Sequence, residues 1–215
     1  TLGPAIGGIR CHNYSTNSAQ LDDAMRLSEG MTFKNAAAGL NHGGAKTTIN
    51  SLKIKDRALA YQILGQEVEA LKGAYICAGD VGTTVEDLFK VKDATDYVAG
   101  ISLDSSLPTA LGTHTSIKAL LKRDKLKVKD QTFNNIFGSR KDILTAHDMG
   151  IKYVPDFIAN CGGVVAVALD FEKKDYKTAL TTGLTKRINK ILDKAESDNI
   201  PVQHAAEELA NNRLK

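Results

Sequence analysis

Short apolar runs that alternate with helical patterns most constrain the fold of this 215-residue chain. "AYICAGD" (74–80) and "YVAGIS" (97–102) have the length and apolar character of buried strands. Helical patterns lie around them, at 17–30, 56–71 and 108–122. Strands that alternate with helices along a chain are typical of α/β proteins with a parallel sheet. The sequence therefore predicts an α/β fold.

Local signals predict where the helices begin and end. Asn17 or Ser18 can cap the first helix, and we expect Gly30 to end it. Thr84 and Asp87 stand in the order of a capping box ahead of a further short helix. We expect the second helix to present one apolar side, formed by Leu59, Ile63, Leu64 and Val68.

The second half of the chain has a different pattern. "IKYVPDFIANCGGVVAVALDF" (151–171) predicts a strand, a proline turn and an apolar segment that begins with Asn-Cys-Gly-Gly. A helix over 176–191 is indicated by the spacing of Leu180, Leu184, Ile188 and Ile191. A short terminal helix over 201–215 follows.

Composition places the chain among ordinary globular proteins, with 42% hydrophobic residues, 25% charged residues and a net charge of +3. The basic residues are too scattered for a nucleic-acid-binding surface, and no apolar run reaches the length of a membrane span. Cys11, Cys77 and Cys161 are odd in number and lack CxxC spacing. We therefore expect reduced thiols, no metal site and a cytoplasmic protein.

Two lysines, Lys34 and Lys46, are the only charged residues in "GMTFKNAAAGLNHGGAKTTIN" (30–50). Three interpretations are open for them. They can be exposed loop lysines, or part of a phosphate-binding loop, although Ala45 stands where that motif requires its second glycine. They can also form a site for proton transfer on a small anionic substrate, since burial and a neighbouring cation both lower the pKa of a lysine. Asp80, at the end of a predicted strand, completes such a site if the fold brings it to Lys46.

Five sequence blocks carry a resemblance that covers nearly the whole chain. They are "GPAIGGIR", "GMTFKNAAAGLNHGGAKTTI", "GDVGTTVEDL", "PTALGT" and "YVPDFIANCGGVVAV", in this order. The chain resembles the Glu/Leu/Phe/Val dehydrogenases, and within them most closely the leucine dehydrogenase branch. The resemblance implies the substrate-binding and oligomerisation domain of an amino-acid dehydrogenase, followed by C-terminal helices. It also implies a homo-oligomer.

The resemblance assigns roles to the polar residues by motif position. Lys34 is expected to hold the substrate carboxylate, helped by the backbone at Gly8 and Met31. Lys46 is expected to be the catalytic lysine of low pKa, which activates water and stabilises the carbinolamine. Asp80 is expected to exchange protons with the substrate amino group.

Further residues match positions around the substrate and the cofactor. The resemblance places Thr109 against the nicotinamide, and Asn134 or Asn135 beside the reacting groups. The positions that line the side-chain pocket are Ile6, Ala78, Val164 and Val167. Because these four are aliphatic and uncharged, they favour a branched aliphatic amino acid over glutamate, which requires a cationic partner. Plain core packing is the alternative for each of them.

The family binds NAD through a Rossmann domain, whose G-x-G-x-x-G fingerprint we do not find in this sequence. The segment up to Phe133 resembles the entry to that domain, and the segment from Asn134 resembles its exit. A domain on the order of 100–150 residues is thus missing between them. From the same resemblance we expect smaller deficits before Thr1 and near "SLDSSLP". We expect either a real deletion or only part of a longer polypeptide.

The resulting expectation is a substrate domain at 1–133 and a C-terminal segment at 134–215 that returns to it. As a full-length protein it is expected to be an enzyme that carries out NAD-dependent oxidative deamination of a branched-chain L-amino acid to the 2-oxo acid and ammonia. NAD would bind through the domain that this chain lacks. The alternative is a non-catalytic amino-acid-binding or assembly module that has lost its cofactor domain.

Overall fold

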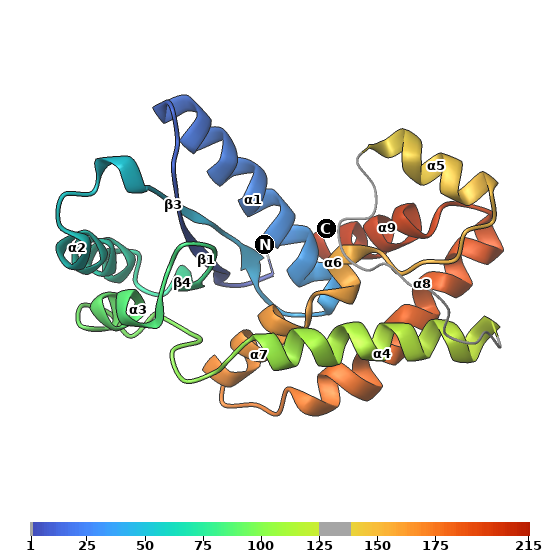
Figure 1. Cartoon of the computed structure of the whole chain (residues 1–215). Coiled ribbons are helices and arrows are strands. Elements are labelled where there is room, and N and C mark those ends of the chain that lie inside the picture. Colours follow the sequence, from blue (N-terminus) through green and yellow to red (C-terminus); the bar gives the residue numbers. More distant parts are fainter. Residues whose placement is uncertain (1, 125–138) are drawn as a thin grey trace.

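The computed structural model describes residues 2–124 and 139–215 and contains a four-stranded parallel sheet with helices on both faces (Figure 1). The strands are β1 (Ala5–His12), β2 (Gly43–Gly44), β3 (Thr47–Asn50) and β4 (Tyr75–Gly79). β1 lies in the middle, because β4 pairs with one of its sides and the two short strands β2 and β3 pair with the other. The α/β fold predicted from the sequence is confirmed.

Helices make up most of the remaining described residues. They are α1 (Asn17–Ala38), α2 (Arg57–Ala70), α3 (Val85–Lys92), α4 (Ser106–Asp124), α5 (Arg140–Asp148), α6 (Asp156–Ala159), α7 (Gly162–Phe171), α8 (Leu184–Asp198) and α9 (Val202–Leu214). A 3₁₀ turn at Ser51–Lys53 precedes α2, and a π-helical turn at Ala179–Gly183 leads into α8. Within the two described ranges, no helix combines the length and apolarity needed to cross a bilayer.

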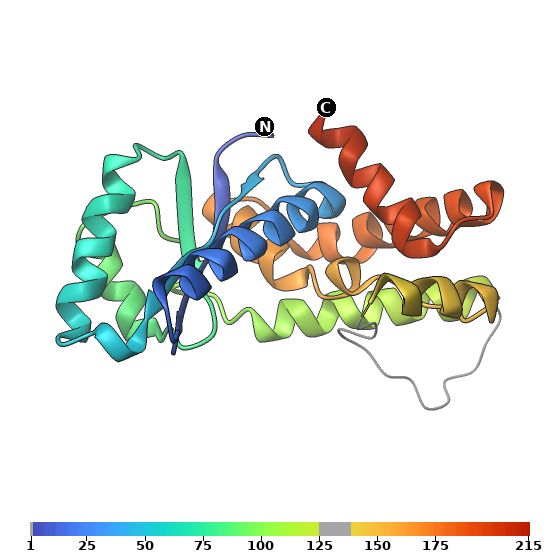
Figure 2. The ribbon, with the colours of Figure 1, turned by 90° about the horizontal axis from the view of Figure 1, so that it is seen from above.

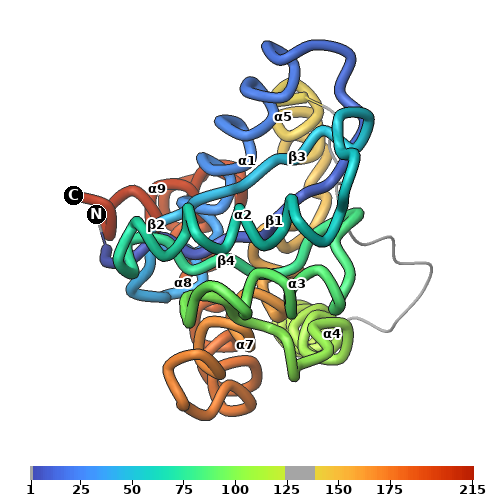
Figure 3. Tube along the Cα trace, turned by 90° about the vertical axis from the view of Figure 1, so that its left-hand side faces the viewer, coloured from blue at the N-terminus to red at the C-terminus, as the bar shows by residue number. Residues whose placement is uncertain are grey.

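Side chains of the sheet alternate between two hydrophobic clusters, as the two-residue period of a strand requires. Ile9 and Cys77 pack with α2 and α3, which lie in front of the strands in Figure 3. Ile6 and Ala78 point to the opposite face and pack with α1 and the C-terminal helices. Residues from both halves of the chain therefore meet on the α1 face of the sheet.

The C-terminal helices return to the first half of the chain (Figure 2). α9 packs against α1, while α4 packs against both α7 and α8. The amphipathic helix predicted from the second half is confirmed, since Leu184, Ile188 and Ile191 are buried along α8. The predicted division at residue 133 falls outside the described residues and stays a prediction.

Helix α1 differs from the sequence-based expectation at both ends. Thr16, rather than Asn17 or Ser18, is the N-cap, and its side chain accepts a hydrogen bond from the Ala19 amide at 3.1 Å. Gly30 does not end the helix, which continues to Ala38 and is capped by Gly39. A glycine inside a helix costs only about 1 kcal/mol, and the following turns bury Asn35–Ala38 against the rest of the molecule. Lys34 therefore lies on a helix and not in a glycine-rich turn.

Three further expectations need correction. Residues 97–102 form no strand, and only Val98 makes an isolated bridge, to Cys77. No strand forms at 151–154 either. On α2 the buried face is Tyr61, Gly65 and Val68, whereas Leu59 and Ile63 are half exposed. In each case the apolar residues alone did not determine the structure, because contacts with distant segments decide which strands pair and which helix face is buried.

Several local expectations are confirmed. The capping box at the start of α3 forms, with Thr84 accepting from the Asp87 amide and Asp87 accepting from the Thr84 amide. The second, fourth and last helices lie where the patterns placed them. All three cysteines are free and buried.

Candidate functional site

The sheet places Lys46 and Asp80 on either side of its central strand. Ile9 of β1 pairs with Thr47 of β3 on one side and with Gly79 of β4 on the other. Lys46 comes directly before Thr47, and Asp80 comes directly after Gly79. The two charged residues therefore flank β1 at nearly the same level, although 34 positions separate their numbers.

Two glycines in β1 allow this close approach. A Cβ atom at Gly7 would lie 1.7 Å from the carbonyl oxygen of Ala45, next to Lys46. A Cβ atom at Gly8 would lie 2.8 Å from the Cβ atom of Asp80. Any side chain at either position would push apart the segments that carry the two charges. The two glycines are therefore required for Lys46 and Asp80 to lie close together.

Lys46 and Asp80 form an ion pair. The Nζ atom of Lys46 lies 3.1 Å from Oδ2 of Asp80, and the lysine side chain is only 7% exposed. Burial lowers the pKa of Lys46; Asp80 opposes this shift, and the cation of Arg10 adds to it. A lysine with a lowered pKa can give up its proton nearer to neutral pH than an exposed lysine can.

Lys34 reaches the same region from α1 but makes no ion pair or hydrogen bond with any described residue. Burial lowers its pKa as well, opposed by the thiol of Cys161 and by Asp156, and reinforced by Lys46. An ammonium group withdrawn from water without a bonded partner is costly. The position is suited to an anionic ligand that supplies the missing partner.

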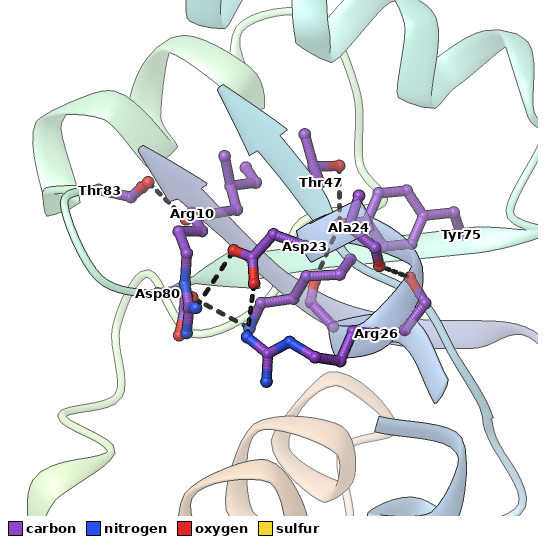
Figure 4. A network of polar contacts seen from close by, with 12 residues as sticks. Arg10, Asp23, Ala24, Arg26, Thr47, Tyr75, Asp80 and Thr83 are labelled. Carbon is purple, nitrogen blue, oxygen red and sulfur yellow. Dashed lines mark hydrogen bonds and ion pairs between the residues drawn. The ribbon is translucent and has the colours of Figure 1, made fainter. Parts of the chain in front are cut away.

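A third cation, Arg10, organises the carboxylates of the site (Figure 4). Its Nε atom donates to Oδ2 of Asp80 at 2.8 Å, and its Nη1 atom lies 3.5 Å from Oδ2 of Asp23. The hydroxyl of Tyr14 also donates to Asp23, at 2.8 Å, and burial together with this bond raises the pKa of Tyr14 to about 12. The network therefore runs from Lys46 through Asp80 and Arg10 to Asp23.

The two oxygens of Asp80 have different surroundings. Oδ2 receives both Arg10 and Lys46. Oδ1 makes no hydrogen bond to any residue of the described ranges. Because both cations approach one oxygen, the carboxylate is fixed in place while its other oxygen stays available to a ligand.

A cavity of about 600 Å³ opens beside Asp80. Ala78 and Val167 line it together with Asp80, and the loops 83–85 and 100–105 complete its wall. Ile6 and Val164 are not among its lining residues. They pack in the hydrophobic cluster between α1 and α7, where Ile6 is 1% exposed.

The remaining sequence-predicted residues lie around this region. Thr109, in the first turn of α4, packs on Gly163 at the start of α7, and its hydroxyl donates to the Ser105 carbonyl at 2.7 Å. The backbone of Met31 lies against Gly44, where a Cβ atom would be 2.6 Å from the Met31 carbonyl carbon. Asn134 and Asn135 lie outside the described residues. In 2–124 and 139–215, no cluster of His, Cys, Asp or Glu has the composition to hold a metal ion.

Sequence reasoning assigned no role to several residues that the fold brings to the site. These are Arg10, Asp23, Asp156 and Cys161. Two of them stand inside conspicuous sequence blocks, Arg10 at the end of "GPAIGGIR" and Asp156 in "YVPDF". A charged residue among glycines and apolar residues was the sequence pattern that could have identified Arg10 and Asp156 as candidate site residues.

Comparisons of sequence extend over the whole chain. The family described as "Glu/Leu/Phe/Val dehydrogenase, dimerisation domain" matches residues 1–97. The leucine dehydrogenase of Bacillus subtilis (strain 168) is 31% identical over 310 residues, covering 100% of this chain and 85% of that protein. The phenylalanine dehydrogenase of Lysinibacillus sphaericus is 42% identical over 126 residues, which cover 55% of this chain and 33% of that protein.

Comparisons of structure show the same fold in more distant proteins. The L-tryptophan dehydrogenase from Nostoc punctiforme superposes with a TM-score of 0.84 at 22% identity, covering 99% of this chain and 89% of that one. The hetero-hexameric glutamate dehydrogenase from Thermus thermophilus, in a leucine-bound form, superposes with a TM-score of 0.74 at 15% identity, covering 99% and 80%. At these identities the likeness concerns the fold alone.

Proposed function

We propose, from the membership of this chain in the Glu/Leu/Phe/Val dehydrogenase family, that it forms the substrate site for reversible oxidative deamination of a branched-chain L-amino acid. The observation that carries the proposal is the half-buried Lys34, which has no ion pair with a described residue and interacts electrostatically with Lys46 and Asp80. Two lysines of lowered pKa and one carboxylate supply an anion partner, a base and a proton carrier within a single region.

Each charged group has a distinct task in this proposal. Lys34 binds the substrate carboxylate, because of the two lysines it is the one that forms no ion pair with a described residue. Lys46 in its neutral form accepts the proton of the attacking water, and in its charged form it stabilises the oxygen of the carbinolamine. Oδ1 of Asp80 exchanges a proton with the substrate nitrogen, while Arg10 holds Oδ2 in place.

The aliphatic lining favours an aliphatic side chain on the substrate. Ala78 and Val167 belong to the apolar lining of the cavity beside Asp80, together with Val85, Leu88, Ile101 and Leu103, and no lysine or arginine of the described residues lines it. A glutamate side chain would lose its hydration there without gaining a cationic partner. Ile6 and Val164 support these residues from the core. We therefore propose leucine or a similar amino acid as the substrate.

The described residues do not provide a site for a whole NAD molecule. Among them, no turn from the end of a strand to the start of a helix carries the G-x-G-x-x-G fingerprint of a pyrophosphate site, and the turn between β4 and α3 has only Gly79 and Gly82. The sequence match to the Bacillus subtilis enzyme runs over 310 residues, whereas this chain has 215. That difference supports an internal deficit of about one domain. Hydride transfer is therefore proposed only for a form that also carries a nucleotide-binding domain.

Assembly into a homo-oligomer is part of the same proposal. It is supported by the match to a family described as a dimerisation domain. It is also supported by the hexameric assembly stated for the Thermus thermophilus relative in fold. Gel filtration with light scattering on the purified chain tests it, and a strictly monomeric protein would contradict it.

Intact mass and two assays test the function. Protein longer than 23.1 kDa by a domain should reduce NAD with L-leucine at alkaline pH. Protein of 23.1 kDa should bind 4-methyl-2-oxopentanoate without forming NADH. A long form inactive on every aliphatic amino acid would contradict the enzyme. If 23.1 kDa is the natural mass, the Lys46–Asp80 site, which forms without a nucleotide-binding domain, favours the amino-acid-binding module instead.

A further inference from the structure

A second cavity lies away from the Lys46–Asp80 site, between the C-terminal turn of α1 and helices α8 and α9. Its volume is about 210 Å³. The apolar walls are formed by Ala36, Ala37, Ile191, Ala206 and Leu209. The polar residues that line it are Arg187, Lys190, Arg213 and Asn212. Three cations and no carboxylate therefore face one small, largely apolar space.

Arg187 is the cationic residue of this cavity whose charge is least compensated by the described residues. It forms no hydrogen bond or ion pair with any residue in 2–124 or 139–215. Burial lowers its pKa, and the neighbouring Arg213 lowers it further, while the thiol of Cys161 opposes the shift. Partial burial of a guanidinium group beside a second guanidinium group costs free energy, and an anion bound there would lower that cost.

The end of helix α1 compensates only part of this charge. Arg213 donates to the Ala36 carbonyl at 2.8 Å and to Oδ1 of Asn41 at 2.9 Å, so it binds neutral acceptors. Arg187 packs on Gly39, where a Cβ atom would lie 1.6 Å from its Nη2 atom. The C-terminus of a helix carries roughly half a negative charge. Two full positive charges exceed that, and the cavity remains cationic.

We propose that this cavity binds a small organic carboxylate with an aliphatic body. The carboxylate pairs with Arg187, whose planar fork of N–H donors matches two carboxylate oxygens. The aliphatic part fills the apolar end between α1 and α9. Inorganic phosphate satisfies the cations equally but leaves the apolar walls in contact with water, so the wall composition favours the carboxylate.

This site is separate from the substrate site of the proposed function. Lys34 and Arg187 both interact electrostatically with Cys161, which lies between α6 and α7. The two sites are therefore near each other, but Lys34 does not line the second cavity. Neither Lys46 nor Asp80 lines it.

Calorimetric titration of the purified 215-residue chain with 4-methylpentanoate tests the proposal. Lys34→Met removes the proposed substrate-carboxylate site, so the binding that remains reports the second cavity. In that background, Arg187→Met should weaken binding about tenfold, because it removes the charge and keeps most of the side-chain volume. Arg187→Lys should bind with an affinity between those of the parent and Arg187→Met, because it keeps the charge but loses the two-point contact of the guanidinium fork. The neutral 4-methylpentan-1-ol should bind at least about tenfold more weakly than the acid.

Three results would overturn the proposal. The first is loss of all 4-methylpentanoate binding in Lys34→Met alone. The second is unchanged affinity in Arg187→Met, with circular dichroism showing that the variant is folded. The third is equal binding of the alcohol or of inorganic phosphate, which would remove the stated ligand class. If instead Lys34→Met changes nothing while Arg187→Met abolishes binding, the second site stands and the proposed role of Lys34 fails.

Discussion

Two arginine–aspartate pairs lie near the same end of the sheet and differ in how completely they are bonded. Arg57 donates to both oxygens of Asp87, at 2.8 and 2.6 Å, and also to the Gly82 carbonyl at 2.6 Å. Asp87 further accepts from the Thr84 amide. Arg10, in contrast, reaches one oxygen of Asp80, which it shares with Lys46.

This difference in bonding indicates that one ion pair stabilises the fold and that the other belongs to a ligand-binding site. Both oxygens of Asp87 are occupied, and Arg57 also lies over the ring of Tyr61 at 5.2 Å. Asp80 keeps Oδ1 free of the described residues and borders a cavity. We call Arg57–Asp87 the closed pair and Arg10–Asp80 the open pair. The closed pair contributes to the stability of the native state, whereas the open pair can still form a hydrogen bond with a ligand.

The largest expected effect is on turnover. In a form that carries a nucleotide-binding domain, Lys46→Ala should reduce kcat by about 10²–10⁴-fold, because it removes the proposed proton acceptor. Steady-state rates with L-leucine measure this. The unfolding midpoint should change little, since Arg10 still pairs with Asp80. Full turnover in Lys46→Ala would show that this lysine takes no part in the mechanism. The ion pairs of Asp80 would then have only a structural role.

At the closed pair we expect a loss of stability without a loss of ligand binding. Asp87→Ala should lower the free energy of unfolding by about 2–3 kcal/mol, because it breaks the capping box and leaves Arg57 without its carboxylate. Urea denaturation measures the change. Ligand binding at the Lys46–Asp80 site should persist. If Asp87→Ala abolished ligand binding and left the free energy of unfolding unchanged, the closed pair would belong to the binding site and not to the fold.

The same pair predicts a pH dependence of stability. Its hydrogen bonds lower the pKa of Asp87 below the ordinary value of 3.8, although burial acts in the other direction. The carboxylate therefore stabilises the fold fully above pH 3.8, and this contribution is lost as the pH falls through the lower folded-state pKa. The stability difference between wild type and Asp87→Asn should narrow in the same acid range, as measured by urea titrations at several pH values.

A smaller effect is expected on affinity. Lys34→Met should weaken binding of 4-methyl-2-oxopentanoate to the 215-residue chain by about tenfold, because it removes the proposed carboxylate partner. It should also preserve or raise the stability of the fold, since it replaces a half-buried ammonium group, which no described residue pairs, by an apolar side chain. Calorimetry and thermal unfolding provide the two measurements. Unchanged affinity would show that the substrate carboxylate binds elsewhere.

The smallest effect concerns the pKa of Lys46. Arg10 lowers this pKa through its charge, so Arg10→Met should raise it. Reductive methylation with ¹³C-formaldehyde, followed by NMR titration, reports the pKa directly. Lys46→Arg identifies the resonance. A pKa that falls in Arg10→Met would mean that the arginine acts mainly by orienting Asp80 and not by repelling the lysine.

Local patterns predicted much of the fold. The capping box at Thr84, the end of β4 before Asp80 and the apolar face of α8 all follow from interactions within a few residues. Such interactions are short in sequence, and they are visible in the order of residue types. The candidate site residues came from a resemblance, and their catalytic roles stay proposals.

Other features depended on contacts between distant segments. Gly30 predicts the end of a helix, yet α1 passes through it because the turns beyond it are buried. The proposed roles of Arg10 and Arg187 depend on neighbours from other strands and helices, and 70 positions separate Arg10 from Asp80.

The sequence by itself determined the α/β class, most helix positions and the set of lysines and aspartates available for chemistry. Only the tertiary structure decided which of these charges are paired and which are buried without a partner. The physical reason is that propensity and capping act along the chain, whereas desolvation and ion pairing depend on which segments enclose a group. Lys34 and Lys46 are alike in sequence context, and the fold alone gives Lys46 a carboxylate and leaves Lys34 without an ion pair among the described residues.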